Sequence, residues 1–160
     1  MKNKAGFSLI ELMIVIAIIA FLAMISMPSF VRFLAKAKRT EAYVNLSSIY
    51  AAQKAYWAQH GSYSDVLNGE NGIGWKPEGY KGGGEQENFY YTYGFAHGSE
   101  GKNFFTGKLK TAGSQLSLAK ADKSSFLVVA AGDIDGDGVP DILTVDENNT
   151  IRIVQDDLAD

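Results

Sequence analysis

A charge-free apolar run near the N-terminus constrains the fold more than any other feature of the sequence. It extends from Leu12 to Val31, so it holds 20 residues without a charged side chain, and Glu11 stands directly before it. As an α-helix the run would measure about 30 Å, which is roughly the hydrocarbon thickness of a lipid bilayer. It therefore predicts a helix that lies in a membrane or in the core of a helical assembly.

The residues after this run continue as an amphipathic helix. Gly61 follows His60 and is a typical helix stop. We expect one helix over about residues 7–59, kinked or locally melted near Pro28 because proline removes a backbone hydrogen bond. Side chains at steps of three and four residues form one mostly apolar stripe on its second half: Ala42, Leu46, Ile49, Tyr50, Gln53, Tyr56 and Trp57.

A secretory signal peptide is the alternative explanation of the N-terminus. Three observations oppose it: the apolar run is long for such a segment, no Ala-x-Ala-like cleavage site with a loop follows it, and the amphipathic helix continues directly. The sequence thus favours a helical stem attached to a globular part.

The rest of the chain predicts an ordinary folded domain. Of the 160 residues of the whole chain, 46% are hydrophobic and 21% charged, which argues against overall disorder. The chain has no cysteine, which excludes disulfides and thiolate metal sites. The connection over residues 61–88 is rich in glycine, so no regular structure is expected there.

Beyond this connection the sequence predicts an antiparallel sheet. Residues 89–95 alternate aromatic side chains in the manner of a strand, and residues 147–149 suit a hairpin turn. The expected strands cover residues 89–95, 106–110, 115–119, 125–130, 142–145 and 150–154. The predicted fold is α+β: a long N-terminal helix packed on a C-terminal antiparallel sheet.

The stretch GDIDGDGVPD carries the one metal-binding pattern that we find. Its acids occupy positions 1, 3, 5 and 9 of a calcium loop, glycine occupies position 6, and the carbonyl of position 7 is available. Position 12 is Thr144 rather than glutamate, so Asp146 or Glu147 is left as a possible closing ligand. A solvated Asp-Gly turn is the alternative. We predict a structural calcium ion with the ligands Asp133, Asp135, Asp137, Val139 and Asp141.

Other functional classes find less support. His60 and His97 have no evident acidic or cysteine companions, and no serine stands in a nucleophile elbow, so we expect no enzyme. A nucleic-acid role is not indicated. The basic cluster is interpreted as contacts at a membrane edge and within an assembly: Arg32, Lys36, Lys38 and Arg39.

The N-terminal stretches resemble a known family. GFSLIELMIVIAIIAFLAMISMPSF, residues 6–30, resembles the N-terminus of type IV pilins and of the related pseudopilins of type II secretion systems. EAYVNLSSIYAAQKAYWAQHGSYSD, residues 41–65, is similar to the helix and loop entry that follow in pilins. The clear resemblance covers about residues 1–65.

This resemblance implies a processing pathway. A prepilin peptidase would remove a leader of residues 1–6 by cutting between Gly6 and Phe7, and Phe7 would be N-methylated. Residues 7–34 would form the transmembrane and filament-core half of the helix, and residues 35–160 a globular head with the helix half, the loop 61–88 and the sheet 89–160. The protein would be held in the cytoplasmic membrane and then join an extracellular filament on the cell surface.

The resemblance also implies assembly residues, namely Phe7, Glu11 and Pro28. A carboxylate in a bilayer costs at least a few kcal/mol and persists where it gains a partner. In the family's filaments the glutamate corresponding to Glu11 meets the N-terminal amine of a neighbouring subunit. The expected partners are copies of the same chain in a helical filament, the peptidase, the membrane and the pilus assembly machinery.

Three functions stay open at this point. The first is a structural subunit of a bacterial type IV pilus. The second is a pseudopilin of a type II secretion system, which the calcium loop supports somewhat. The third is a membrane-anchored calcium-binding module that does not polymerise.

Overall fold

The structure, a computed structural model, describes residues 6–159 and divides into two compact units. The units are Met1–Leu34 and Ala35–Asp160. We call the described part of the first, residues 6–34, the N-terminal segment, and that of the second, residues 35–159, the head. Residues 1–5, which make up most of the predicted leader, lie outside the described residues.

One long helix, α1, runs from Leu9 to His60, within two residues of the predicted bounds. It is unbroken at Pro28, so the local melting expected there does not occur. Its last turn closes with a bond from the Gly61 backbone N–H to the Trp57 carbonyl at 2.8 Å.

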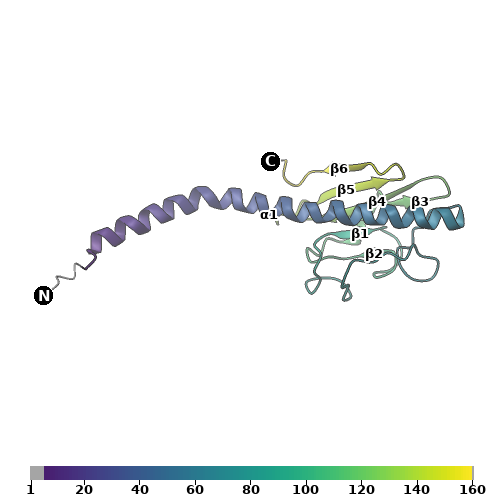
Figure 1. The fold of residues 1–160 in the computed structure, drawn as a ribbon, viewed down its shortest axis with the longest axis horizontal. Helices are drawn as coiled ribbons and strands as arrows, with labels where there is room; N and C mark the ends of the chain where they lie inside the picture. Colours follow the sequence, from purple (N-terminus) through teal and green to yellow (C-terminus); the bar gives the residue numbers. More distant parts are fainter. Residues whose placement is uncertain (1–5, 160) are drawn as a thin grey trace. The chain divides into compact units, whose positions relative to one another are not determined.

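The strands of the head form one antiparallel sheet, which confirms the α+β fold (Figure 1). The strand order is β2-β1-β4-β5-β6, and β3 pairs with β4 on the same side as β1. The longest ladders join β4 to β5 and β5 to β6. The strands are β1 (Thr92–Gly94), β2 (Phe104–Phe105), β3 (Lys120–Ala121), β4 (Phe126–Gly132), β5 (Asp141–Asp146) and β6 (Ile151–Gln155).

Two predicted strands were wrong. Residues 115–119 are replaced by a 3₁₀ helix, η1 (Gly113–Leu116), which buries Leu116, and by a turn that leads into β3. Residues 106–110 are a loop in which the backbone N–H groups of Lys108 and Leu109 bond to the carbonyls of Phe89 and Tyr90. In both cases the local residue pattern is typical of a strand, but the segment does not pair along its length with a neighbouring strand of the sheet.

The core lies between the second half of α1 and the sheet. The predicted stripe is buried at Ala42, Leu46 and Ile49, which pack in one cluster with the aromatic side chains of β1 and its neighbours. Tyr93 illustrates the join: its hydroxyl donates to Glu41 of α1 at 3.0 Å and accepts from the Asn45 amide at 3.0 Å.

Side chains of α1 also organise the glycine-rich connection. The Trp75 indole N–H donates to the Ser48 hydroxyl at 2.7 Å. The Gln53 amide, fully buried, bonds to both the backbone carbonyl and the backbone N–H of Ser64. The connection is therefore fixed by the helix although it has no regular structure.

Candidate functional site

The start of α1 is closed by a capping box formed by Ser8 and Glu11. The Glu11 backbone N–H donates to the Ser8 hydroxyl at 3.2 Å, and the Ser8 backbone N–H donates to Glu11 Oε2 at 3.2 Å. Two N–H groups that the first helical turn cannot satisfy are thus paired reciprocally. Glu11 therefore has a local structural role that the sequence analysis did not assign.

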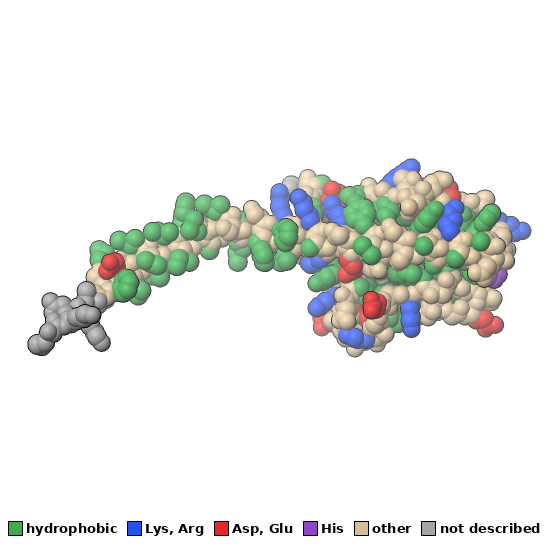
Figure 2. Space-filling model, viewed as in Figure 1, with side chains coloured by type: hydrophobic (Ala, Val, Ile, Leu, Met, Phe, Trp, Pro, Cys, Tyr) green, Lys and Arg blue, Asp and Glu red, His purple; other side chains and the backbone are tan. Residues whose placement is uncertain are grey.

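The surface of the N-terminal segment is apolar and uncovered. Every residue from 6 to 34 is exposed, with Phe7 at 86% and Ile19 still at 60%. Figure 2 shows hydrophobic side chains along this segment. Among the described helices, α1 is long and apolar enough to cross a membrane, by length and composition. A surface of this kind in water is unfavourable, so it needs lipid or protein around it.

The predicted processing and assembly residues all lie on this segment. Gly6 and Phe7 precede α1, Glu11 is in its first turn and Pro28 is in its interior, all of them exposed. Phe7 and Glu11 are thus available to another molecule, and the cleavage and pairing assigned to them stay predictions.

A second candidate site, a cluster of acidic side chains, lies in the head at the loop between β4 and β5. Carboxylate oxygens of four aspartates lie within 4.8 Å of one another. Three of them, Asp133, Asp135 and Asp137, were predicted as metal ligands; the fourth, Asp157, follows β6 and was not. Val139 is half-exposed, and its backbone N–H donates to Asp137 at 2.7 Å.

The loop backbone is shaped by its own acids. Asp133 accepts bonds from the N–H groups of Gly136 and Gly138 at 2.7 and 3.0 Å. These glycines have φ of +90° and +94°, which side-chain-bearing residues rarely adopt, so glycine is needed for this sharp turn. The turn leaves the three loop carboxylates on one side, together with Asp157.

Asp157 is buried, with 5% of its surface exposed. Its Oδ2 accepts bonds from the backbone N–H groups of Ile134 and Asp135 at 2.8 and 3.3 Å. Its Oδ1 is buried and has no hydrogen-bond partner among the described residues. Burial raises the pKa of Asp157, and the charges of Asp135 and Asp133 act in the same direction.

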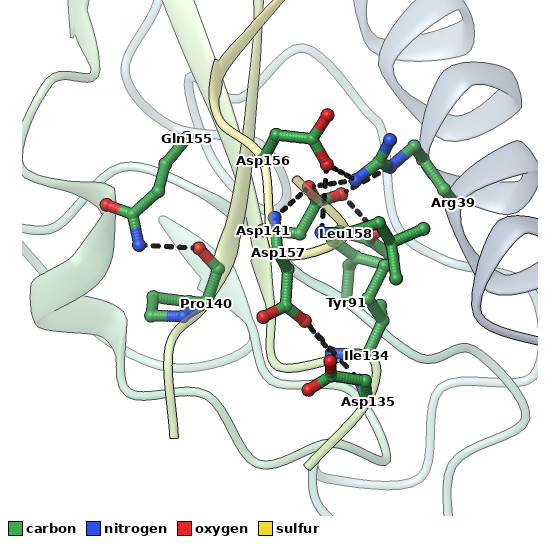
Figure 3. A network of polar contacts seen from close by, with 10 residues as sticks. All are labelled: Arg39, Tyr91, Ile134, Asp135, Pro140, Asp141, Gln155, Asp156, Asp157 and Leu158. Atoms are coloured by element: carbon green, nitrogen blue, oxygen red, sulfur yellow. Dashed lines mark hydrogen bonds and ion pairs between the residues drawn. The ribbon is translucent and has the colours of Figure 1, made fainter. Parts of the chain in front are cut away.

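The structure does not bring Asp141 into the acidic cluster. Its side chain is fully buried and forms a two-pronged ion pair with Arg39, with Nε to Oδ2 at 2.9 Å and Nη2 to Oδ1 at 2.6 Å (Figure 3). Arg39 also pairs with Asp156, and the Tyr91 hydroxyl donates to Asp141 at 2.7 Å. Burial and the neighbouring Asp141 raise the pKa of Tyr91, so its phenol stays a donor.

Lys38 and Arg39 therefore serve the head. The Lys38 ammonium donates to the Ile134 carbonyl at 2.6 Å, and Arg39 ties α1 to the start of β5 and the end of β6. The sequence predicts contacts at a membrane edge and within an assembly for both residues, because a basic cluster beside an apolar run is typical of such locations.

The signal for Asp157 was present in the hairpin register. β5 and β6 are antiparallel, and Ile142 pairs with Gln155, so the residues just after β6 return beside the start of β5 and its preceding loop. Counting outward from the turn at residues 147–149 would have placed the acids after β6 there. The loop pattern alone favoured Asp141, since it considers only residues that are close in sequence.

Comparisons with known proteins agree with the N-terminal features. The prokaryotic N-terminal methylation motif matches residues 1–27. The type IV major pilin protein PilA of Myxococcus xanthus (strain DK1622) is 49% identical over 73 residues, which are 46% of this chain and 32% of that protein. The type IV pilus subunit protein TapA of Aeromonas hydrophila is 47% identical over 73 residues, 46% of this chain and 51% of TapA.

The chain thus spans about a third and about half of the length of these two curated relatives. The motif covers Gly6, Phe7 and Glu11 and ends one residue before Pro28. The N-terminal part of the chain thus carries a prokaryotic methylation motif on an apolar helix and is similar to two type IV pilins over 73 residues.

Proposed function

We propose that this protein is a structural subunit of a bacterial type IV pilus. In this proposal the leader is cut between Gly6 and Phe7, Phe7 is N-methylated, and the N-terminal segment anchors the chain in the cytoplasmic membrane. The same segment then carries the subunit into a surface filament, where neighbouring N-terminal segments replace lipid. The two relatives, a major pilin and a pilus subunit, favour a pilus over a secretion pseudopilus.

The observation that carries the proposal is the exposed apolar surface of residues 6–34, most of which also match the N-terminal methylation motif. No buried residue of the described chain precedes Ala35, so this surface makes no core of its own. Lipid hides such a helix before assembly, and equivalent helices hide it in a filament. Apolar helices lose little by this exchange, because lipid tails and aliphatic side chains are similar surroundings.

Glu11 would set the axial register of the subunit as the N-terminal segment moves from lipid into the filament. Removal of the leader creates an amine at Phe7, four residues before Glu11 on the same apolar segment. Each charge alone is costly in hydrocarbon, and an amine and a carboxylate from neighbouring subunits form a pair that offsets this cost. A contact of one subunit's start with the next subunit's first turn does not close on itself, so it builds a helical filament.

The decisive experiment compares Glu11→Ala with Ser8→Ala in cells that lack the native chain. Ser8→Ala removes the side-chain cap of α1, which costs about 1 kcal/mol of helix stability, but retains the Glu11 carboxylate. We expect Ser8→Ala to form filaments and Glu11→Ala to accumulate in the membrane without forming them. Sheared surface filaments are quantified by immunoblot and electron microscopy.

Mass spectrometry of both variants controls for processing and should find a chain that starts at N-methylated Phe7. Normal filaments from processed Glu11→Ala, or an equal loss in both variants, would show that Glu11 acts only as part of the helix cap. An unprocessed wild-type chain that begins at Met1 would remove the pilin proposal altogether.

A further inference from the structure

The acidic cluster of the head has a composition that suits a hard divalent cation. Asp133, Asp135 and Asp137 come from one loop and Asp157 from the segment after β6, and one oxygen of each lies within 4.8 Å of the others. Four carboxylates at this separation repel one another strongly unless a cation or protons neutralise them. Arg39, the arginine nearby in Figure 3, is engaged by Asp141 and Asp156 instead.

A second and independent observation points to a ligand. Asp157 is 95% buried, given its 5% exposure, and its Oδ1 has no partner among the described residues. A buried carboxylate oxygen without a donor is costly, and such atoms are rare in folded proteins. Its other oxygen is fixed by two backbone N–H groups of the loop, so the carboxylate cannot turn toward solvent without breaking those bonds. A cation bound in the cluster, where one oxygen of this carboxylate lies, would neutralise its charge.

The ligand atoms select the class of cation. All are carboxylate oxygens, which suit calcium or magnesium and not the softer transition metals. The ligands alternate along an irregular loop, and the exposed positions of Asp135 and Asp137 leave room for water. Calcium accepts six to eight oxygens in flexible geometry, whereas magnesium requires a near-ideal octahedron.

We propose that Asp133, Asp135, Asp137 and Asp157 bind one calcium ion, which fastens the segment after β6 to the β4–β5 loop. This set replaces the one predicted from the sequence, since Asp141 is held by Arg39. The ion acts as a cross-link between two chain segments in a protein without cysteine. Since the site lies wholly in the head, it does not depend on polymerisation.

The test uses the full chain in detergent micelles, freed of divalent ions with EDTA and dialysed. Calcium chloride is titrated by calorimetry and by thermal unfolding, and magnesium chloride is titrated in parallel. We expect one calcium per chain and a melting temperature that rises by several degrees. Magnesium should bind at least about tenfold more weakly.

The variants assign the ligands. Asp157→Asn should weaken calcium binding by roughly tenfold or more, because it removes one charge from the ligand set. In EDTA its melting temperature should equal or exceed that of the wild type, since the unpartnered buried oxygen is gone; a purely structural role predicts a lower one. Asp135→Asn, at an exposed position, should weaken binding without affecting the fold.

Asp146→Asn is the matched control. Asp146 also accepts backbone N–H bonds in a turn, from Asn148 and Thr150, but lies outside the cluster, so its variant should bind calcium like the wild type. The proposal is overturned if calcium at about 1 mM produces neither heat of binding in calorimetry nor a shift in the melting temperature. It is also overturned if Asp157→Asn and Asp135→Asn bind as tightly as the wild type, or if magnesium binds equally well.

Discussion

Ionisable side chains at the junction of α1 with the sheet are held by specific partners. Glu41 is half-buried, and its Oε1 accepts bonds from the Tyr90 backbone N–H at 2.9 Å and the Tyr93 hydroxyl at 3.0 Å. Burial raises the pKa of Glu41, while those two bonds act in the opposite direction. The charged form is therefore tolerated at a cost, which makes Glu41 a source of pH-dependent stability.

The first prediction concerns this pH dependence. Because the folded state holds the Glu41 proton more tightly than the unfolded state, wild-type stability falls as pH rises from the ordinary value of 4.5 through the raised folded pKa. Glu41→Gln retains an oxygen acceptor and has no charge, so its stability relative to wild type should increase over that window and then level off. Urea unfolding in detergent at a series of pH values measures the difference.

Glu41→Ala provides the comparison at the same position. It removes the acceptor and leaves the Tyr90 N–H and the Tyr93 hydroxyl short of a partner, so it should cost about 1–3 kcal/mol at every pH. If the difference in unfolding free energy between the wild type and Glu41→Gln does not vary with pH, the first prediction is contradicted.

At the scale of elements, the close approach of β1 to the chain before β2 fixes one edge of the sheet. Gly94 has φ of +127°, and a Cβ there would lie 2.3 Å from the Asn103 carbonyl oxygen and 2.9 Å from Leu67. The Phe95 N–H bonds to that same carbonyl at 3.0 Å. The two segments meet at a distance that only glycine permits.

The second prediction follows from this contact. Gly94→Ala should destabilise the head by several kcal/mol, because backbone must move in addition to the strain of a positive φ. Gly69→Ala is the matched control, since its φ is +98° and nothing lies within 4 Å of its added Cβ. It should show the backbone cost alone, about 1–2 kcal/mol. Equal melting temperatures for the two variants would show that the Asn103 contact is relaxed at little cost.

The sequence predicted elements with strong periodicity and missed those that depend on distant partners. The helix, its stripe at Ala42, Leu46 and Ile49, and the hairpin of β5 and β6 were all readable, because their signals lie within a few residues. The short strands β2 and β3 were misplaced, since two-residue strands exist only through their pairing. Arg39 and Asp157 were missed for the same reason: their contacts are more than 20 residues away.

At the scale of the whole molecule, the two units differ in what they need from their surroundings. All buried residues of the described chain belong to the head, and the exposed large apolar side chains are concentrated in residues 7–34. The head has its own core cluster, whereas the N-terminal segment has none. The head should therefore not depend on lipid for its stability.

The third prediction tests this separation. A fragment of residues 35–160 should be soluble without detergent, monomeric, and cooperatively folded with mixed helix and strand signals in circular dichroism. The full chain should require detergent, because its apolar helix surface associates in water. Light scattering and thermal unfolding measure both properties. An aggregated or unfolded fragment would mean that the N-terminal segment contributes to the fold of the head.

The pairing of Arg39 with Asp156 has a consequence for the order of events during biosynthesis. The two residues are 117 positions apart, so the arginine leaves the ribosome long before either of its acids is made. The Arg39–Asp156 pair can therefore form only after the segment that follows β6 has been translated. A chain released just before Asp156 would contain α1 and all the described strands, the last of which ends at Gln155, but it would lack the Arg39–Asp156 pair.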